Sequence, residues 1–280
     1  MEVQGSVAEP FRGVRELFAH VLAEQTGTGA SFAVWHDGAW VVDVWGGYAD
    51  SAHNRPWQQD TLVMPYSVTK PFAALCVLTL ADRGLVDLDD PMQLFWPELR
   101  AAASVRDVLA HRAGLVVLDA DAPQEAFYDW GLMCSLLARQ EPTWPPGSAQ
   151  GESALFYGHL LGQVVRAVDG RSLGRFLREE ICNPHDLDFH IGLDGTELSR
   201  VADLTGFGDD FAASQQDRPG LYRRAIENPP GPATPGSSTA SGGVALRSRP
   251  STVTGPPGVW PGCTWPWHTA ASLARTCRRS

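Results

Sequence analysis

Two residues of the segment MPYSVTKPF, Ser67 and Lys70, have the types and the spacing needed for nucleophilic catalysis. The segment is predicted to open a helix, and side chains three residues apart lie on the same helical face. Lys70 is the only lysine among the 22 lysines and arginines of the chain. A buried lysine can lose its proton and act as a base, whereas a guanidinium stays charged. The pair therefore indicates a serine that a neutral amine activates; a solvated lysine beside a helix cap is the alternative.

The rest of the chain predicts strands first and mostly helices afterwards. Two strands are expected within residues 29–50, joined by a tight turn at His36-Asp37-Gly38. Apolar residues at helical spacing, separated by breakers, predict helices over residues 10–25, 67–84, 104–114, 124–140, 153–168 and 172–182. This order is typical of the α+β class, with an antiparallel sheet flanked by helices and a mainly helical region.

Composition argues against several classes of protein. A formal charge of −10 disfavours nucleic-acid binding, because phosphates need basic partners. No 18 consecutive residues are all apolar, so a membrane partner is not expected. The five cysteines are odd in number and lack C-x-x-C spacing, which favours reduced thiols in the cytoplasm. The eight histidines show no metal-binding spacing, so no metal is expected, and His111 is interpreted as ordering a turn.

Residues 55–92, RPWQQDTLVMPYSVTKPFAALCVLTLADRGLVDLDDPM, resemble the serine β-lactamase and penicillin-binding-protein superfamily. Within it they are most similar to the esterase branch that resembles class C β-lactamases. Further similar segments occur in order, among them VVDVWGGYAD, VRDVLAHRAGL, PTWPPG and DFHIGL, so the resemblance extends over about residues 10–205.

This resemblance implies a β-lactamase/transpeptidase-like fold and an acyl-serine mechanism. Ser67 would be the nucleophile and Lys70 its base or proton relay. Esters of small acids are the substrates that the resemblance implies. No cofactor is expected, because acyl transfer to serine requires none.

The family's third catalytic element, Tyr-x-Asn or a variant of it, is altered in this chain. Its expected position, about five residues after the Pro-Gly of the PTWPPG turn, holds Glu152-Ser153-Ala154. Glu152 is interpreted either as a general base beside the serine or as a solvated carboxylate at a helix N-terminus. Tyr157, five residues later, is the alternative source of a phenol, although its position normally packs in the core.

The family's fourth element, a Lys-Thr-Gly, His-x-Gly or Trp-x-Gly triplet on a late strand, is not found. No lysine follows Lys70, and His190-Ile191-Gly192 belongs by its context to an earlier block. In the family this strand supplies one oxyanion-hole amide, and losing one such donor lowers the rate by about 10²–10³. We therefore expect the late strands of the sheet to be missing.

The end of the chain differs in composition from the rest. No acidic residue follows Glu227, and nine of the 21 prolines lie between Pro229 and Pro266. The predicted division is an incomplete β-lactamase-like serine hydrolase domain over residues 1–227 and a Pro/Gly/Ser-rich tail over residues 228–280. The tail is interpreted as disordered or as the product of a shifted reading frame.

The predicted function is a serine hydrolase, a carboxylesterase that cleaves small-molecule esters through an acyl-serine intermediate. A β-lactamase or D-alanyl peptidase, acting on amides, is the alternative within the same chemistry. A catalytically inactive remnant or binding module is the alternative from another class, and Glu152 and the acid-free tail favour it.

Overall fold

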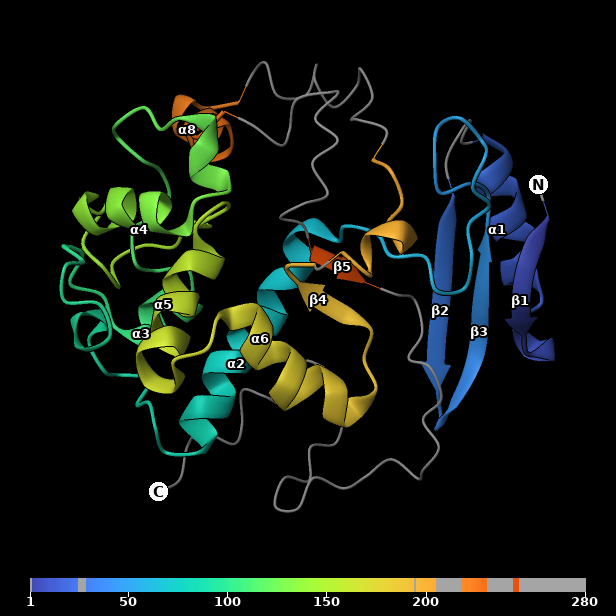
Figure 1. Ribbon diagram of the computed structural model, residues 1–280, viewed down its shortest axis with the longest axis horizontal. Helices are drawn as coiled ribbons and strands as arrows, with labels where there is room; N and C mark the ends of the chain where they lie inside the picture. The colour runs from blue at the N-terminus through green and yellow to red at the C-terminus, as the bar shows by residue number, and fades with distance from the viewer. Residues whose placement is uncertain (1, 25–28, 194, 205–217, 231–243, 247–280) are drawn as a thin grey trace.

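The structure, a computed structural model, describes residues 2–24, 29–193, 195–204, 218–230 and 244–246. Two regions lie at opposite ends of the long axis of the molecule (Figure 1). The sheet region comprises the described residues up to Gly46, and the helical region comprises residues 69–182. The predicted α+β class, with an antiparallel sheet near the start of the chain and mostly helices after it, is confirmed.

The sheet region is built from three strands, β1 (Val3–Val7), β2 (Ala30–His36) and β3 (Ala39–Gly46), in the order β1-β3-β2. Both pairings are antiparallel. The turn between β2 and β3 holds Asp37 at φ 47° and Gly38 at φ 79°, and a two-residue hairpin turn needs this left-handed backbone. The predicted hairpin is therefore confirmed, and β1 is an additional strand.

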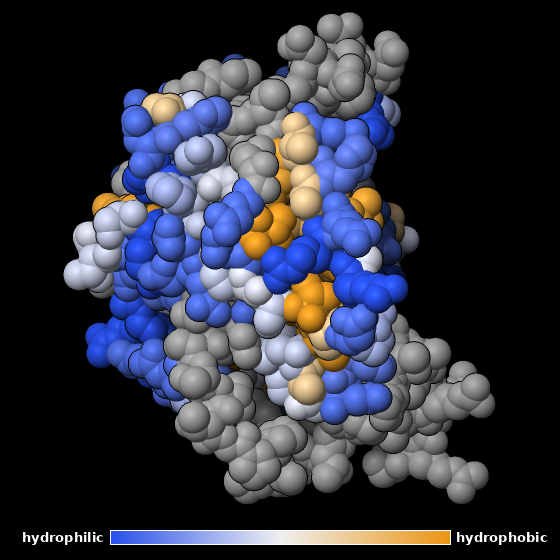
Figure 2. All heavy atoms as spheres, turned by 90° about the vertical axis from the view of Figure 1, so that its right-hand side faces the viewer, coloured by the Kyte–Doolittle hydropathy of each residue, from blue (hydrophilic) through white to orange (hydrophobic). Residues whose placement is uncertain are grey.

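One helix, α1 (Gly13–Glu24), packs against β1 and β3. Leu22 of this helix and Val44 of β3 are almost completely buried. The outer side of α1 exposes Leu17 and Val21, which are 62% and 42% exposed. Figure 2, which views the molecule from this end, shows hydrophobic patches lying between hydrophilic residues. The sheet region thus buries few of its apolar side chains deeply.

The helical region is organised around α2 (Thr69–Asp82), which packs against two later helices. Its side chains Cys76, Val77 and Leu80 have no exposed surface. Each fully buried aliphatic side chain stabilises the fold by about 1.5–3 kcal/mol. The other main helices of this region are α3 (Val105–Leu109), α4 (Trp130–Arg139), α5 (Tyr157–Asp169) and α6 (Leu173–Leu177).

Several predicted helices are interrupted or preceded by a tighter turn. The helix expected over residues 124–140 is divided into a 3₁₀ turn, η4 (Gln124–Phe127), and α4, because Asp129 caps α4. Its carboxylate accepts the Leu132 N–H at 2.9 Å. The remaining short helices are η1 (Glu9–Phe11), η2 (Tyr66–Val68), η3 (Met92–Leu94), the π-helical turn η5 (Arg178–Cys182), η6 (Asn183–His185) and η7 (Leu198–Arg200). No helix of the described chain is long and apolar enough to span a bilayer.

A second, two-stranded sheet lies beside the helical region, where β4 (Phe189–Ile191) pairs antiparallel with β5 (Val244–Leu246). Phe189 also stacks on Phe72 of α2, with ring centroids 3.8 Å apart. β5 falls inside the segment predicted to be a tail. Within the described residues the two sheets have three and two strands, and the absence of further late strands stays a prediction.

The predicted boundary after residue 227 follows the helix α8 (Gly220–Glu227) directly. Asn228, the first residue beyond it, is 9% exposed. Its amide group donates to the carbonyls of Leu118 and Ala120 and accepts the N–H of Ala122. Asn228 thereby ties α8 to the loop before η4, and the division of the chain at this point stays a prediction.

Candidate active site

Ser67 lies in η2, the turn that leads into α2, and its side chain is exposed. Lys70 lies in the first turn of α2, and its Nζ is 2.7 Å from Ser67 Oγ. The Lys70 side chain is only 15% exposed. The structure therefore brings together the two residues that S-x-x-K spacing singled out. Their catalytic roles stay predictions.

The backbone around Ser67 explains this placement. Tyr66 has φ 47°, in the left-handed region that bulky residues rarely adopt, and this sharp turn precedes the serine. Pro71 sits in the first turn of α2, where a missing N–H costs no helical hydrogen bond. The chain can therefore turn and begin the helix within a few residues, which places Ser67 Oγ and Lys70 Nζ on the same side.

Glu152 contacts the other side of the Lys70 amine, with its Oε1 2.9 Å from Nζ. The carboxylate is 56% exposed and precedes the start of α5 by five residues, so it is outside the first turn of that helix. The residues on both sides of it bond to His111. The Gly151 N–H donates to the His111 carbonyl at 2.9 Å, and the Ser153 N–H donates to His111 Nδ1 at 3.3 Å.

His111 links this carboxylate to the end of α3. Its φ of 57° places it in a tight turn, so the interpretation that it orders a turn is confirmed. Burial lowers the pKa of His111, while the nearby Glu152 charge raises it and the Lys70 charge lowers it. The neutral ring fits its role as an acceptor at Nδ1. The contact between this turn and the residues around Glu152 could not be read from the sequence. Only the turn itself was indicated, by the H-x-x-G-L segment.

Tyr157 is brought near the site but is turned away from it. Its residue surface is 5% exposed, and its ring stacks on His111 with centroids 4.5 Å apart. The hydroxyl donates to the Leu109 carbonyl at 3.1 Å, and burial raises the pKa of Tyr157. These contacts are those of a packed core residue, and a catalytic role for this phenol has no support in its geometry.

His190 belongs to the triplet that was not assigned to the late-strand element. Its ring contacts acidic side chains. Its Nε2 lies 2.8 Å from Asp188 Oδ1, and its Nδ1 lies 3.9 Å from Glu197 Oε1. Arg200 also pairs with Asp188. Burial raises the pKa of Asp188, but the bonds to His190 and Arg200 outweigh this and lower it. This group of charges joins β4 to η7 and has the character of a structural network.

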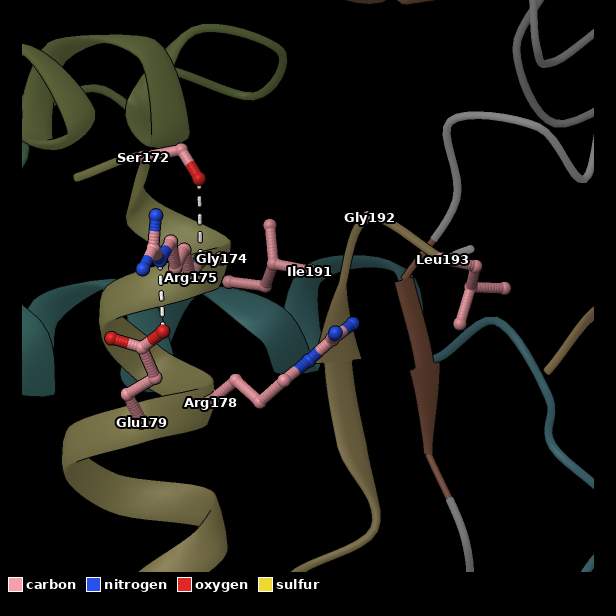
Figure 3. A pocket seen from close by; sticks show the side chains of 8 residues that line it. All are labelled: Ser172, Gly174, Arg175, Arg178, Glu179, Ile191, Gly192 and Leu193. Atoms are coloured by element: carbon pink, nitrogen blue, oxygen red, sulfur yellow. Dashed lines mark hydrogen bonds and ion pairs between the residues drawn. The ribbon is translucent and has the colours of Figure 1, made fainter. Parts of the chain in front are cut away.

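A separate hollow of about 370 Å³ lies between α6 and the end of β4 (Figure 3). Its polar lining includes Ser172, Arg175 and Glu179, and Arg175 Nε donates to Glu179 at 2.8 Å. Ile191 and Leu193 supply apolar surface on the opposite side. Its lining includes neither the serine nor the lysine of the candidate active site.

Cys76, Cys134 and Cys182 are free and buried, as expected for reduced thiols. Burial raises the pKa of Cys76 to about 12 and that of the other two to about 11, so these thiols are poor nucleophiles. Cys263 and Cys277 lie outside the described residues. Among the described residues, no group of three or more histidine, cysteine, aspartate or glutamate side chains could hold a metal ion.

The Beta-lactamase family profile matches residues 14–253 of this chain. The chain therefore belongs to the beta-lactamase family, as the resemblance predicted. The match extends beyond residue 205, where the visible resemblance ended, and beyond the predicted boundary at residue 227.

Relatives of known name agree with the esterase branch of this family. The esterase/beta-lactamase LipL of Mycobacterium tuberculosis is 36% identical over 221 residues, which are 76% of this chain and 50% of that protein. A family VIII carboxylesterase of known structure is 37% identical with a TM-score of 0.72, covering 83% of this chain and 63% of its own. A penicillin-binding protein homologue from Caulobacter crescentus is 32% identical with a TM-score of 0.74, covering 88% and 68%. The β-lactamase/transpeptidase-like fold is therefore confirmed.

The chain spans about half the length of the curated relatives it matches, since 50% of LipL and 46% of an Escherichia coli beta-lactamase are covered. Residues 14–253, which the family profile matches, include Ser67, Lys70 and Glu152.

Proposed function

We propose that this protein is a serine hydrolase that cleaves small carboxylic esters through an acyl-serine intermediate, with Ser67 as the nucleophile. The observation that carries the proposal is the 2.7 Å contact between Ser67 Oγ and the largely buried Lys70 Nζ. A hydroxyl held by a shielded amine at the start of a helix is the arrangement that activates a serine. The esterase names of LipL and of the family VIII carboxylesterase support ester substrates.

The proposed reaction has two halves. Ser67 Oγ attacks the ester carbonyl carbon while its proton leaves toward Lys70, and the tetrahedral intermediate then expels the alcohol. Water attacks the acyl-serine in the second half and releases the acid. The exposed position of Ser67 leaves its oxygen open to a small-molecule substrate, and the chain's formal charge of −10 disfavours nucleic acid as a partner.

A fluorophosphonate probe, which reacts with activated serines, tests the proposal. We expect the wild-type protein to be labelled at Ser67, as located by peptide mass spectrometry, and S67A to remain unlabelled. Ser135→Ala, which removes an exposed serine from α4, is the matched control and should be labelled like the wild type. An unlabelled wild-type protein would instead support the inactive remnant or binding module.

A β-lactamase or D-alanyl peptidase is the second candidate, because the name of LipL includes beta-lactamase and the Caulobacter crescentus structure is that of a penicillin-binding protein homologue. Hydrolysis of nitrocefin compared with that of a short-chain p-nitrophenyl ester separates the two. We expect kcat/KM to be higher for the ester, and a preference for nitrocefin would reverse the order of the candidates.

We also propose a cytoplasmic location. The three free, buried cysteines of the described chain support it, because thiols stay reduced in that compartment. Fractionation of cells that express the protein at its natural level, followed by detection with an antibody, would test this location.

A further inference from the structure

Lys70 contacts two oxygen atoms of different character. Its Nζ lies 2.7 Å from the Ser67 hydroxyl and 2.9 Å from the Glu152 carboxylate. A carboxylate at this distance attracts the charged ammonium, which has three N–H donors and no acceptor. An ammonium can donate to Ser67 Oγ but cannot take the serine proton until it has given one up. The carboxylate on its other side is the group that can receive that proton.

Glu152 is held in place by its own neighbours. A Cβ added at Gly151 would come within 2.4 Å of the Trp144 ring, so the backbone passes where only glycine fits. On the other side, the Ser153 hydroxyl donates to the buried Leu115 carbonyl at 2.6 Å. With the two bonds to His111, these contacts fix the backbone on both sides of the carboxylate. A carboxylate whose only role was to keep the surface hydrated would not need its backbone held on both sides.

The Tyr157 phenol, the other candidate for accepting the proton, makes its contacts away from Lys70. The Tyr157 hydroxyl donates to the Leu109 carbonyl, and the His111 ring covers its face. Glu152 is the acidic side chain that the described structure places in an ion pair with Lys70.

We infer that Glu152 receives the Ser67 proton by way of Lys70, an inference that rests on the proposed function. As Ser67 Oγ bonds to the ester carbonyl carbon, the Lys70 ammonium gives a proton to Glu152 Oε1 and takes up the hydroxyl proton. The serine O–H bond is broken, Lys70 is again an ammonium and Glu152 is a neutral acid. When the bond to the alcohol breaks, the proton returns by the same route to the leaving oxygen. Glu152 therefore acts through Lys70.

The test compares second-order rates of fluorophosphonate labelling at Ser67. In E152Q the amide can still accept a hydrogen bond but takes no proton, so we expect the rate to fall about 10²-fold, as for loss of a general base. Glu152→Asp should recover part of this loss. Because Glu152 is half exposed, added formate should also raise the rate of Glu152→Ala in a concentration-dependent way. Glu141→Gln, which removes an exposed carboxylate paired with Arg100, should leave the rate unchanged.

Chemical rescue separates proton acceptance from a structural role, because added formate can replace the lost carboxylate but not the backbone contacts around it. His111→Asn, which keeps the Glu152 carboxylate, should gain no labelling rate from formate. Circular dichroism confirms that each variant is folded.

Three results are decisive. Slow labelling of E152Q together with formate rescue of Glu152→Ala supports the inference. Labelling of E152Q at the wild-type rate, with Ser67 still modified in both proteins, overturns the inference and leaves the nucleophile in place. A wild-type protein without label at Ser67 overturns the proposed function and this inference together.

Discussion

The helical region and the sheet region of this molecule are held together in different ways. Within the described residues, one continuous cluster of buried side chains connects α2, α5 and α6 and extends to Phe189 of β4. The sheet region buries Leu22 of α1 and Val44 of β3, but it leaves Phe32 and Trp35 of β2 about half exposed. Lys70 and Glu152 belong to the helical region, and Ser67 directly precedes it. The geometry of the candidate site should therefore depend on the core of the helical region much more than on the sheet.

The largest effect is expected from removing a buried aromatic ring of the helical region. Phe176 of α6 has no exposed surface, and the Arg171 guanidinium lies 5.0 Å above its ring. Phe176→Ala should lower the free energy of unfolding by about 3–5 kcal/mol through the lost burial and the cavity left behind. Urea denaturation followed by circular dichroism measures this change.

The same substitution in the sheet region is the matched control. Phe32 is 46% exposed on β2, so Phe32→Ala should cost roughly 1 kcal/mol or less. An equal loss of unfolding free energy in Phe176→Ala and Phe32→Ala would mean that the helical region is not more tightly packed than the sheet region.

The features of the fold that depend on neighbouring residues could be predicted from the sequence. Asp37-Gly38 specified the hairpin turn. The helix expected from residue 104 does begin there, because Ser104 is its N-cap and forms a capping box with Asp107. The strand β1 was missed because its segment VQGSV has an apolar residue only at each end, so no strand alternation is visible. Local signals thus gave the element types but not every boundary.

Only the part of the candidate site formed by residues close in sequence could be predicted. Ser67 and Lys70 meet because they lie three residues apart where η2 leads into α2, and their spacing alone indicates this. The contact between Lys70 and Glu152 depends on how the turn at His111 binds the backbone of Gly151 and Ser153. Such long-range contacts are set by packing, so the sequence could mark the position of Glu152 but could not decide between a base and a solvated carboxylate.

A smaller effect in the helical region is expected from pH. Burial lowers the pKa of His159 from 6.5 to about 4, and the backbone bond at Leu155 only partly opposes this. The folded state therefore binds fewer protons than the unfolded state between about pH 4 and 6.5. The stability from neutral His159 is complete above pH 6.5 and is lost as the pH falls to about 4, by about 2–3 kcal/mol.

His159→Phe isolates this contribution, because the new ring can keep the stacking on Trp130, 4.8 Å away. Urea denaturation at pH 4.5 and 7 should show a smaller difference in unfolding free energy for the variant than for the wild type. An identical pH dependence in the two proteins would contradict a buried, neutral His159.

The smallest effect is expected in the sheet region, where Trp35 and Trp40 face each other across β2 and β3. Their rings meet edge to face with centroids 5.1 Å apart, and Trp35 is 48% exposed. Aromatic pairs of this geometry contribute about 0.5–1.5 kcal/mol beyond burial. A double-mutant cycle with Trp35→Ala and Trp40→Ala should give a coupling energy in this range, whereas Trp35→Phe should retain most of it. A coupling energy above about 3 kcal/mol would show that the hairpin is as tightly packed as the helical core, and the contrast between the two regions would fail.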